Sequence, residues 1–306
     1  MSLIRPKGEL LNVLEYDPSC LIVTHEARLN PAQSGVYSVQ ESWRKFSELT
    51  IPQVGDKVVV WDLQTGELAT LFDLFDFFDP VTERGFMSNG TFPACCNGQG
   101  EIANDWSHLN SVSTSAFDGS LIVSIRHLSA ICSFQAYPAP AAINWCISSE
   151  LENRSDYTFD EDASKFFNQH AVQQLSSGNL LLFDNGDARV EGGYAGGGTT
   201  SRGIELKLDP ATKVASVAWE YPVVYNSHQG SVYPLEGGHF LIHEPNNGGD
   251  AALRKITDKK GVQGISRSIE VDSLGIEVSS LYTSIFHETA YRAVPFKSLL
   301  GEARLY

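Results

Sequence analysis

Residues 105–112, DWSHLNSV, combine side-chain types and spacing that suit chemistry. His108 and Asn110 are two positions apart in a segment rich in β-forming residues, and side chains at i and i+2 of a strand point to one face. An imidazole and a carboxamide would then project together. After a turn at residues 117–120, the next apolar run ends in Arg126, so a hairpin would bring a guanidinium back beside the pair. These groups can bind an anion or move a proton.

The fragment that follows this motif occurs three times. The copies GSLIV, GNLLL and GHFLI begin at Gly119, Gly178 and Gly238, which are 59 and 60 residues apart. A histidine precedes each copy by 11, 8 or 10 residues, namely His108, His170 and His228. A second echo, SRGIEL from residue 201, recurs as SRSIEV 65 residues later. Repeats of this length, each several strands long, indicate a β-propeller, and 306 residues at about 50 per repeat give six blades.

A propeller would bring the three histidines together. The innermost strand of each blade faces the central channel, so equivalent positions of successive blades form a ring. We therefore expect one axial pocket lined by His108, Asn110, Arg126, His170 and His228. For any single histidine, the alternative is a structural hydrogen bond to a neighbouring carbonyl or turn.

Composition agrees with an all-β domain. The chain is 42% hydrophobic and 19% charged, as in soluble globular proteins, and its 26 glycines and 13 prolines favour short strands joined by tight turns. Helical periodicity is weak, with residues 162–175 the only arguable stretch. We predict a single domain over residues 1–306, folded as a six-bladed β-propeller.

Charge and apolar runs limit the partners and the location. A net charge of −15 and a pI near 4.9 argue against nucleic acid or an anionic membrane as partner. No run approaches the roughly 20 apolar residues of a membrane span, and the N-terminus shows no signal peptide. We expect a cytoplasmic protein that acts on a small molecule, and its oligomeric state stays open.

The sequence predicts neither a metal nor a cofactor. The five cysteines follow no zinc spacing, and we expect reduced, buried thiols. The glycine-rich residues 192–203 lack the lysine of a phosphate-binding loop, so a mobile loop is expected there. The acidic residues 150–162 lack the spacing of a calcium-binding loop.

Several motifs together resemble a known family, the arylsulfotransferases that work without a nucleotide sulfate donor. The matching pieces, in order, are DWSHLNSV, SLIVSIRHLSAI, NQHAVQQLSSGNLLLFDNG, SRGIELKLD, AWEY and YRAVPFKSL. The likeness covers roughly residues 55–300. It implies a six-bladed propeller that moves a sulfuryl group from one phenol to another, with a small phenolic or aromatic substrate. The exported bacterial members carry an additional N-terminal β-domain, which is not recognised in this sequence.

The resemblance also implies roles for single residues. His170, in NQHA, matches the nucleophilic histidine that is transiently sulfurylated. His108 and Asn110 match a pair that binds the sulfuryl oxygens, and Arg126 matches the arginine downstream of it. His228, or Ser231 after it, falls where the family contributes a further polar residue. The family's additional N-terminal histidine has no matched counterpart, because His25 stands in a different local context.

The chemistry suits these residue types. A neutral imidazole is nucleophilic near neutral pH, and covalent transfer divides one difficult displacement into two easier ones. Trp106 is a candidate aromatic wall for the substrate, with a core position as the alternative. Two other functions stay open. One is hydrolysis, elimination or cyclisation of a small metabolite in the same His/Asn/Arg pocket, and the other is a non-catalytic propeller that binds a protein.

Overall fold

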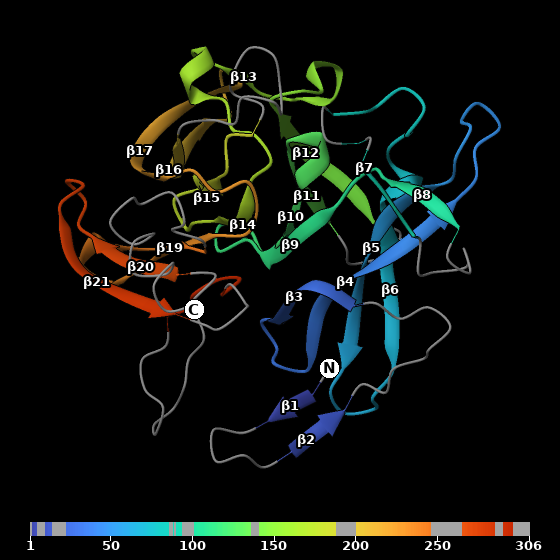
Figure 1. The fold of residues 1–306 in the computed structure, drawn as a ribbon, viewed down its shortest axis with the longest axis horizontal. Helices are drawn as coiled ribbons and strands as arrows, with labels where there is room; N and C mark the ends of the chain where they lie inside the picture. The colour runs from blue at the N-terminus through green and yellow to red at the C-terminus, as the bar shows by residue number, and fades with distance from the viewer. Residues whose placement is uncertain are drawn as a thin grey trace, which may run out of the picture. The chain divides into compact units, whose positions relative to one another are not determined.

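The computed structural model describes residues 2–4, 10–13, 23–85, 88, 90–93, 101–135, 141–187, 200–245, 265–284 and 290–295 (Figure 1). The chain divides into two compact units. The first comprises Met1–Thr158 with Val172–Ser177, and the second comprises Phe159–Ala171 with Gly178–Tyr306. The loop predicted at residues 192–203 falls mostly outside the described residues, and Cys20, Cys95 and Cys96 fall wholly outside them.

The first unit contains two large sheets and one small one. The first large sheet has the order β3-β4-β5-β8-β7, with β6 also paired to β5. Its strands are β3 (Val23–Leu29), β4 (Gly35–Arg44), β5 (Gln53–Asp62), β6 (Leu68–Asp73), β7 (Gly90–Pro93) and β8 (Ile102–Asp105). The second has four consecutive strands, β9 (Leu109–Thr114), β10 (Leu121–Ile125), β11 (Ala130–Gln135) and β12 (Ala142–Ser148). The small sheet pairs β1 (Ser2–Ile4) with β2 (Leu10–Val13).

Two further sheets follow along the chain. One has the order β13-β17-β16-β15-β14, made of β13 (Thr158–Phe159), β14 (His170–Gln174), β15 (Leu180–Asp184), β16 (Thr200–Asp209) and β17 (Val214–Val224). The other has the order β18-β19-β20-β21, made of β18 (Ser231–Pro234), β19 (Phe240–Glu244), β20 (Ile265–Val271) and β21 (Glu277–Ser284).

The all-β propeller class is confirmed. Four sheets of four to six strands, built mainly from consecutive antiparallel strands, occur in the described part of the chain, against six predicted blades. The repeated GSLIV, GNLLL and GHFLI fragments lead into β10, β15 and β19. Each is the second strand of its sheet when counted from the edge strand β9, β14 or β18. The SRGIEL and SRSIEV fragments form β16 and β20, the third strands of two of them. A single domain over the whole chain stays a prediction.

Helical structure among the described residues is limited to short 3-10 turns. They are η1 (Leu74–Asp76), η2 (Arg126–Leu128), η3 (Glu152–Arg154), η4 (Asp162–Ser164) and η6 (Glu236–Gly238). Residues 162–175, the one stretch with some helical periodicity, form no α-helix, because this segment holds η4 followed by the strand β14. None of the helices found in the described residues is long and apolar enough to cross a membrane.

The core of the first unit explains why these segments form strands. All five residues of β10 are buried, as expected for a strand covered on both faces. Aromatic rings pack around this strand: Phe72 stacks on Phe134 with centroids 4.2 Å apart, and Phe75 stacks on Trp106 with centroids 5.1 Å apart.

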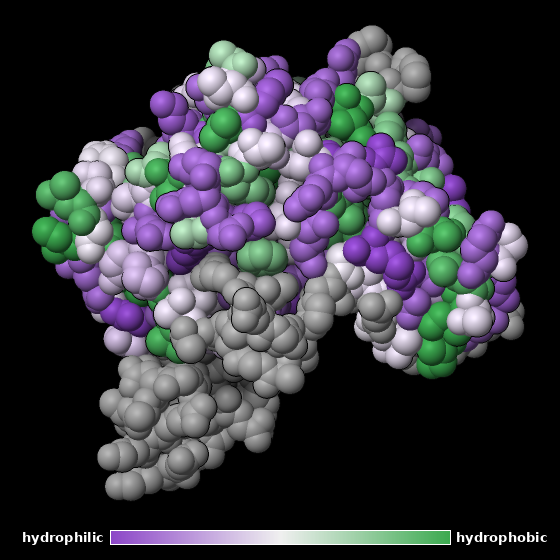
Figure 2. All heavy atoms as spheres, turned by 90° about the horizontal axis from the view of Figure 1, so that it is seen from above, coloured by the Kyte–Doolittle hydropathy of each residue, from purple (hydrophilic) through white to green (hydrophobic). Residues whose placement is uncertain are grey.

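On the surface, apolar residues form separate green patches among hydrophilic ones (Figure 2).

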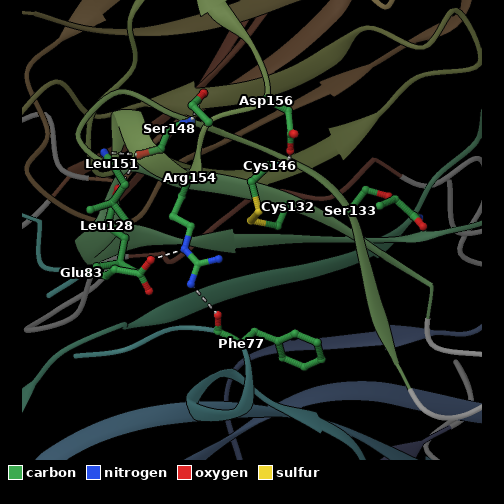
Figure 3. Close-up of a disulfide and its surroundings, with 12 residues drawn as sticks. Phe77, Glu83, Leu128, Cys132, Ser133, Cys146, Ser148, Leu151, Arg154 and Asp156 are labelled. Atoms are coloured by element: carbon green, nitrogen blue, oxygen red, sulfur yellow. Dashed lines mark hydrogen bonds and ion pairs between the residues drawn. A yellow bond between two sulfur atoms is a disulfide. The ribbon is translucent and has the colours of Figure 1, made fainter. Parts of the chain in front are cut away.

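A disulfide between Cys132 and Cys146 joins directly opposed residues of β11 and β12 (Figure 3). The expectation of reduced thiols is wrong for this pair, because antiparallel pairing brings the two Cα atoms to 4.1 Å. The Cys146 N–H also donates to the Asp156 carboxylate at 2.8 Å. Disulfides persist in oxidising surroundings. The cytoplasmic location therefore stays an untested expectation.

Removal of this disulfide should lower the free energy of unfolding by about 3 kcal/mol, since 14 residues separate the cysteines and a crosslink of that span restricts the unfolded chain. The measurement is thermal unfolding of wild type and of a Cys132→Ala/Cys146→Ala double variant, each with and without reductant. Reductant should lower the Tm of wild type and leave that of the double variant unchanged. An equal Tm shift in both proteins would contradict the assignment.

Candidate active site

The predicted hairpin at the DWSHLNSV motif is present in the first unit. Strands β9 and β10 pair antiparallel, with Ile125 opposite Leu109. Beyond the last strand pair, the Arg126 N–H donates to the His108 carbonyl at 3.2 Å, and the His127 N–H donates to the Ser107 carbonyl at 3.0 Å. The hairpin therefore brings the backbone of η2 back to the motif, as the sequence predicted.

The prediction that strand alternation places His108 and Asn110 on one face is wrong. Strand β9 begins only at Leu109, and His108 precedes it with a left-handed φ of +50°. The register then shifts, because Ser124 faces Ser111 while Ile125 faces Leu109, which leaves Asn110 in a bulge. Strict alternation does not apply across a kink and a bulge. Such features re-aim side chains and occur often beside active sites.

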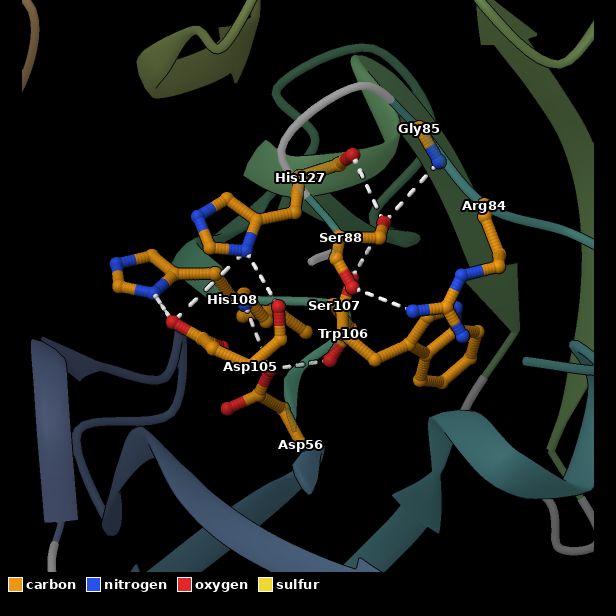
Figure 4. A network of polar contacts seen from close by, with 10 residues as sticks. Asp56, Arg84, Gly85, Ser88, Asp105, Trp106, Ser107, His108 and His127 are labelled. Carbon is orange, nitrogen blue, oxygen red and sulfur yellow. Dashed lines mark hydrogen bonds and ion pairs between the residues drawn. The ribbon is translucent and has the colours of Figure 1, made fainter. Parts of the chain in front are cut away.

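A compact polar cluster occupies this bend (Figure 4). The His108 Nδ1 lies 2.5 Å from the Asp105 Oδ2, and the His127 Nδ1 lies 2.8 Å from the Asp105 carbonyl oxygen and 3.8 Å from Oδ2. The two imidazole rings stack with centroids 4.6 Å apart. The ring of His25, on β3, lies 4.7 Å from that of His108. The imidazoles of His25 and His127 therefore both lie next to that of His108, and His127 is a member of the cluster that the sequence did not predict.

The turn that carries His127 is held by small residues. The Ser88 hydroxyl donates to the Trp106 carbonyl at 2.9 Å and accepts the Gly85 N–H at 3.0 Å. A Cβ on Gly85 would lie 2.0 Å from the His127 carbonyl oxygen, so only glycine fits there. The Ser88 hydroxyl also lies 3.3 Å from the His127 carbonyl oxygen, so these contacts hold the backbone of η2 at His127.

Asp56, on β5, anchors the start of β9 from below the cluster. Its buried carboxylate accepts the Ser107 hydroxyl at 2.5 Å and the Leu109 N–H at 2.7 Å. Burial raises the pKa of Asp56 to about 7, against the lowering effect of these two hydrogen bonds. Burial also raises the pKa of Glu41, and the nearby Asp105 adds to that effect.

Burial has the opposite effect on the pKa of a histidine, because it disfavours the charged imidazolium. It lowers the pKa of His127 to about 3, although the negative charge of Asp105 raises that pKa. The ring of His127 is therefore neutral at physiological pH. Burial alone would raise the pKa of Asp105, but the hydrogen bond from His108 and the charges of His108 and Arg126 hold it below its usual value. Asp105 is thus the permanent anion of the cluster.

The other candidates of the first unit are buried. Asn110 is fully buried, and Arg126 is 6% exposed at the start of η2. Trp106 is also fully buried, stacks on Phe75, and donates its indole N–H to the Glu83 carbonyl at 2.7 Å. The structure therefore places Trp106 in the core, the alternative to an aromatic wall for substrate.

In the second unit, His170 is held from both ring nitrogens. It begins β14, is 2% exposed, and its Nδ1 lies 2.7 Å from the Asn185 Oδ1. Its Nε2 accepts the backbone N–H of Gln229 at 3.1 Å. The side chain of Asn185 in turn donates to the carbonyls of Asn226 at 2.8 Å and Gln229 at 3.0 Å. His170 is thus part of a buried hydrogen-bonded network.

These contacts determine the tautomer of neutral His170. Backbone carbonyls only accept hydrogen bonds, so the Asn185 Nδ2 must face them and Oδ1 must face the ring. Oδ1 only accepts, so Nδ1 carries the proton. The Gln229 N–H only donates, which leaves the lone pair on Nε2. The network therefore directs the nucleophilic electron pair of His170 away from Asn185.

The two remaining candidates lie close to the start of β18. His228 is exposed, and its Nδ1 lies 2.8 Å from the Ser227 hydroxyl. Ser231 is buried, donates its hydroxyl to the Ala293 carbonyl at 3.2 Å, and accepts the Ala293 N–H at 3.3 Å. Ser231 therefore fastens a later segment of the chain to β18.

Comparison with known proteins assigns the family. The family model described as "Arylsulfotransferase (ASST)" matches residues 13–292. The chain belongs to the arylsulfotransferase family. It is similar to "Arylsulfate sulfotransferase AssT" of Escherichia coli O6:H1 (strain CFT073), with 23% identity over 245 residues, covering 65% of this chain and 40% of the relative. The protein of the same name from Lelliottia amnigena is 23% identical over 224 residues, covering 60% of this chain and 37% of the relative.

The chain spans about 40% of the length of these curated relatives. Among solved structures, it is similar to a hypothetical selenium-binding protein from Sulfolobus tokodaii, with a TM-score of 0.41 and 10% identity, over 71% of this chain and 45% of that chain. Membership of the arylsulfotransferase family confirms the resemblance.

The structure divides the predicted arylsulfotransferase pocket between the two units. His108, Asn110 and Arg126 lie in the first, and His170, His228 and Ser231 lie in the second. Their convergence on one axis stays a prediction, as do their individual roles. A separate hollow of about 370 Å³ is lined by Tyr37, Asp118, Gly119, Ser120, Leu121, Gln135 and Asn144, at the turn end of the β9–β10 hairpin and away from His108.

One missed site residue had a signal in the sequence. Asn185 stands seven positions after Gly178, and Arg126 stands seven positions after Gly119, so the two occupy the same place in consecutive repeats. Applying the repeat to Arg126 would have found Asn185. The contact of Gln229 with His170 had no such signal, because it is made by a backbone N–H.

Proposed function

We propose that this protein transfers a sulfuryl group between phenolic compounds through a covalent intermediate on His170. Family membership supports the reaction class, and the tautomer of His170 supports the role of the residue. Its Nδ1–H donates to Asn185 at 2.7 Å, so Nε2 bears the lone pair that a nucleophile needs.

The proposed steps conserve every atom. The Nε2 of His170 attacks the sulfur of an aryl sulfate, an N–S bond forms, and the S–O bond to the phenolate breaks. A second phenol then attacks the same sulfur, loses its proton to a base, and releases the histidine. The Gln229 N–H occupies the Nε2 lone pair at 3.1 Å, so this hydrogen bond must open before attack. Arg126, Asn110 and His108 are the proposed donors to the sulfuryl oxygens.

One observation favours a second function. The Asp105–His108 contact of 2.5 Å is a carboxylate–imidazole pair, an arrangement that supports proton abstraction by a histidine. An enzyme that used only this pair would catalyse hydrolysis, elimination or cyclisation of a small metabolite. It would need no covalent step at His170.

Intact-mass analysis after incubation with an aryl sulfate distinguishes the two functions. Sulfuryl transfer predicts an adduct of about 80 Da on His170, the mass of SO₃ retained in a covalent intermediate. Adding an acceptor phenol should remove the adduct and yield the new aryl sulfate. Wild-type protein that forms no adduct and turns over no aryl sulfate would favour the second function.

A further inference from the structure

Three donor groups of the first unit meet at one point. The Asp105 carboxylate, His108 and His127 each offer one ligand atom, and these atoms all lie within 4.8 Å of one another. Asp105 Oδ2 is 2.5 Å from the Nδ1 of His108 and 3.8 Å from the Nδ1 of His127 (Figure 4). Both rings thus place Nδ1 beside Asp105, that of His108 at the carboxylate and that of His127 at the main-chain carbonyl oxygen, 2.8 Å away.

We propose that Asp105, His108 and His127 bind one divalent transition-metal ion, with Zn²⁺ the best fit. Zinc takes nitrogen and carboxylate oxygen ligands at about 2.0–2.2 Å, so two of its ligand atoms lie at most about 4.4 Å apart. A tetrahedral zinc ion at this range holds its ligand atoms about 3.4 Å apart. The His108 Nδ1 would therefore move away from the Asp105 Oδ2, now at 2.5 Å, and the His127 Nδ1, now at 3.8 Å from Oδ2, would move closer. Two imidazoles and one carboxylate suit zinc or cobalt, whereas calcium and magnesium prefer oxygen ligands.

The backbone supports this geometry before any ion binds. Asp105 ends β8, His108 is fixed at a φ of +50°, and His127 lies in η2. The hydrogen bond from the His127 N–H to the Ser107 carbonyl, at 3.0 Å, ties the segments together. Three donors within 23 residues on tied segments lose little freedom when they bind a metal.

The surroundings of the cluster are also suited to a cation. Glu41, on β4, has a buried Oε2 atom that lacks a hydrogen-bond partner within the described part of the chain. Its carboxylate also interacts electrostatically with Asp105 and His108. A divalent cation would offset this second, half-buried carboxylate as well as that of Asp105.

The ion would also define the role of His108. A metal on Nδ1 leaves the proton on Nε2, which then donates hydrogen bonds. This is the form that binds a sulfuryl oxygen, so this consequence rests on the proposed function. The binding of the ion does not rest on it.

The test uses the full chain stripped with a chelator and titrated with Zn²⁺ by calorimetry, and with Co²⁺ by visible absorption. Wild type should bind one equivalent of each. Asp105→Asn and His127→Gln should each weaken binding by more than about 100-fold, because loss of a partner outside the ligand shell already costs 10–100-fold. The matched control is His239→Gln, which removes a histidine bonded to Glu270 at 2.8 Å in the second unit. It should bind as wild type does.

Wild type that binds no zinc overturns the proposal, as does zinc bound equally well by wild type and Asp105→Asn. Circular dichroism verifies that the variants fold. If His127→Gln does not fold, the zinc titration of Asp105→Asn decides the test. Failure of metal binding leaves the sulfuryl adduct on His170 unaffected. Conversely, absence of that adduct does not alter the zinc titration, so the two proposals fail separately.

Discussion

Replacement of His170 should abolish sulfuryl transfer and the adduct together, since no other group is proposed to hold the sulfuryl moiety. Turnover of an aryl sulfate and intact mass are the two measurements. Because His170 is 2% exposed and hydrogen-bonded at both nitrogens, alanine would leave a polar cavity. His170→Gln, which retains polar atoms, is therefore the second variant. Both should lack transfer completely, and His239→Ala should retain it.

Neighbouring residues should show graded losses. Arg126→Ala should lower turnover by about 10²–10³-fold while the adduct still forms slowly, as expected when one donor to developing charge is removed.

Asn185→Leu removes the acceptor that holds the proton of His170 on Nδ1. In a serine protease, the wrong tautomer of the catalytic histidine lowers kcat by about 10⁴-fold. We expect the kcat of Asn185→Leu to fall by up to this factor. Full activity in Asn185→Leu would contradict the role assigned to the tautomer.

The strands were predictable because their pattern is carried by the residues themselves. GSLIV, GNLLL and GHFLI each combine a turn glycine with an apolar run, and each forms the second strand of a sheet. The hairpin that returns Arg126 to His108 follows from the same pattern. The repeats therefore predicted equivalent strands in three of the described sheets without any knowledge of tertiary contacts.

Local alternation failed where the chain bends. A left-handed φ at His108 and a bulge at Asn110 depend on contacts such as those of Asp56 with Ser107 and Leu109, from a strand about 50 residues earlier. The Cys132–Cys146 disulfide likewise depends on the register of β11 and β12. Single-sequence patterns do not encode which strand lies beside which residue, so these features required the structure.

The buried acid and the buried base of the first unit should give stability curves of opposite slope. Burial raises the pKa of Asp56 from 3.8 to about 7, so the folded state binds the extra proton and stability falls as pH rises through this range. Burial lowers the pKa of His127 from 6.5 to about 3, so the unfolded state binds the extra proton and stability rises with pH through that range. Each effect is on the order of a few kcal/mol.

In wild type the two effects oppose each other between about pH 4 and 6.5, and single variants should separate them. Asp56→Asn removes the falling contribution, so its free energy of unfolding should rise with pH more steeply than that of wild type. His127→Gln removes the rising contribution, so its stability should fall as pH increases toward 7. Urea unfolding at several pH values, with a chelator present to exclude bound metal, measures both slopes. Parallel curves for the two variants would contradict the assignment, because the cluster would then hold neither a protonated Asp56 nor a neutral His127.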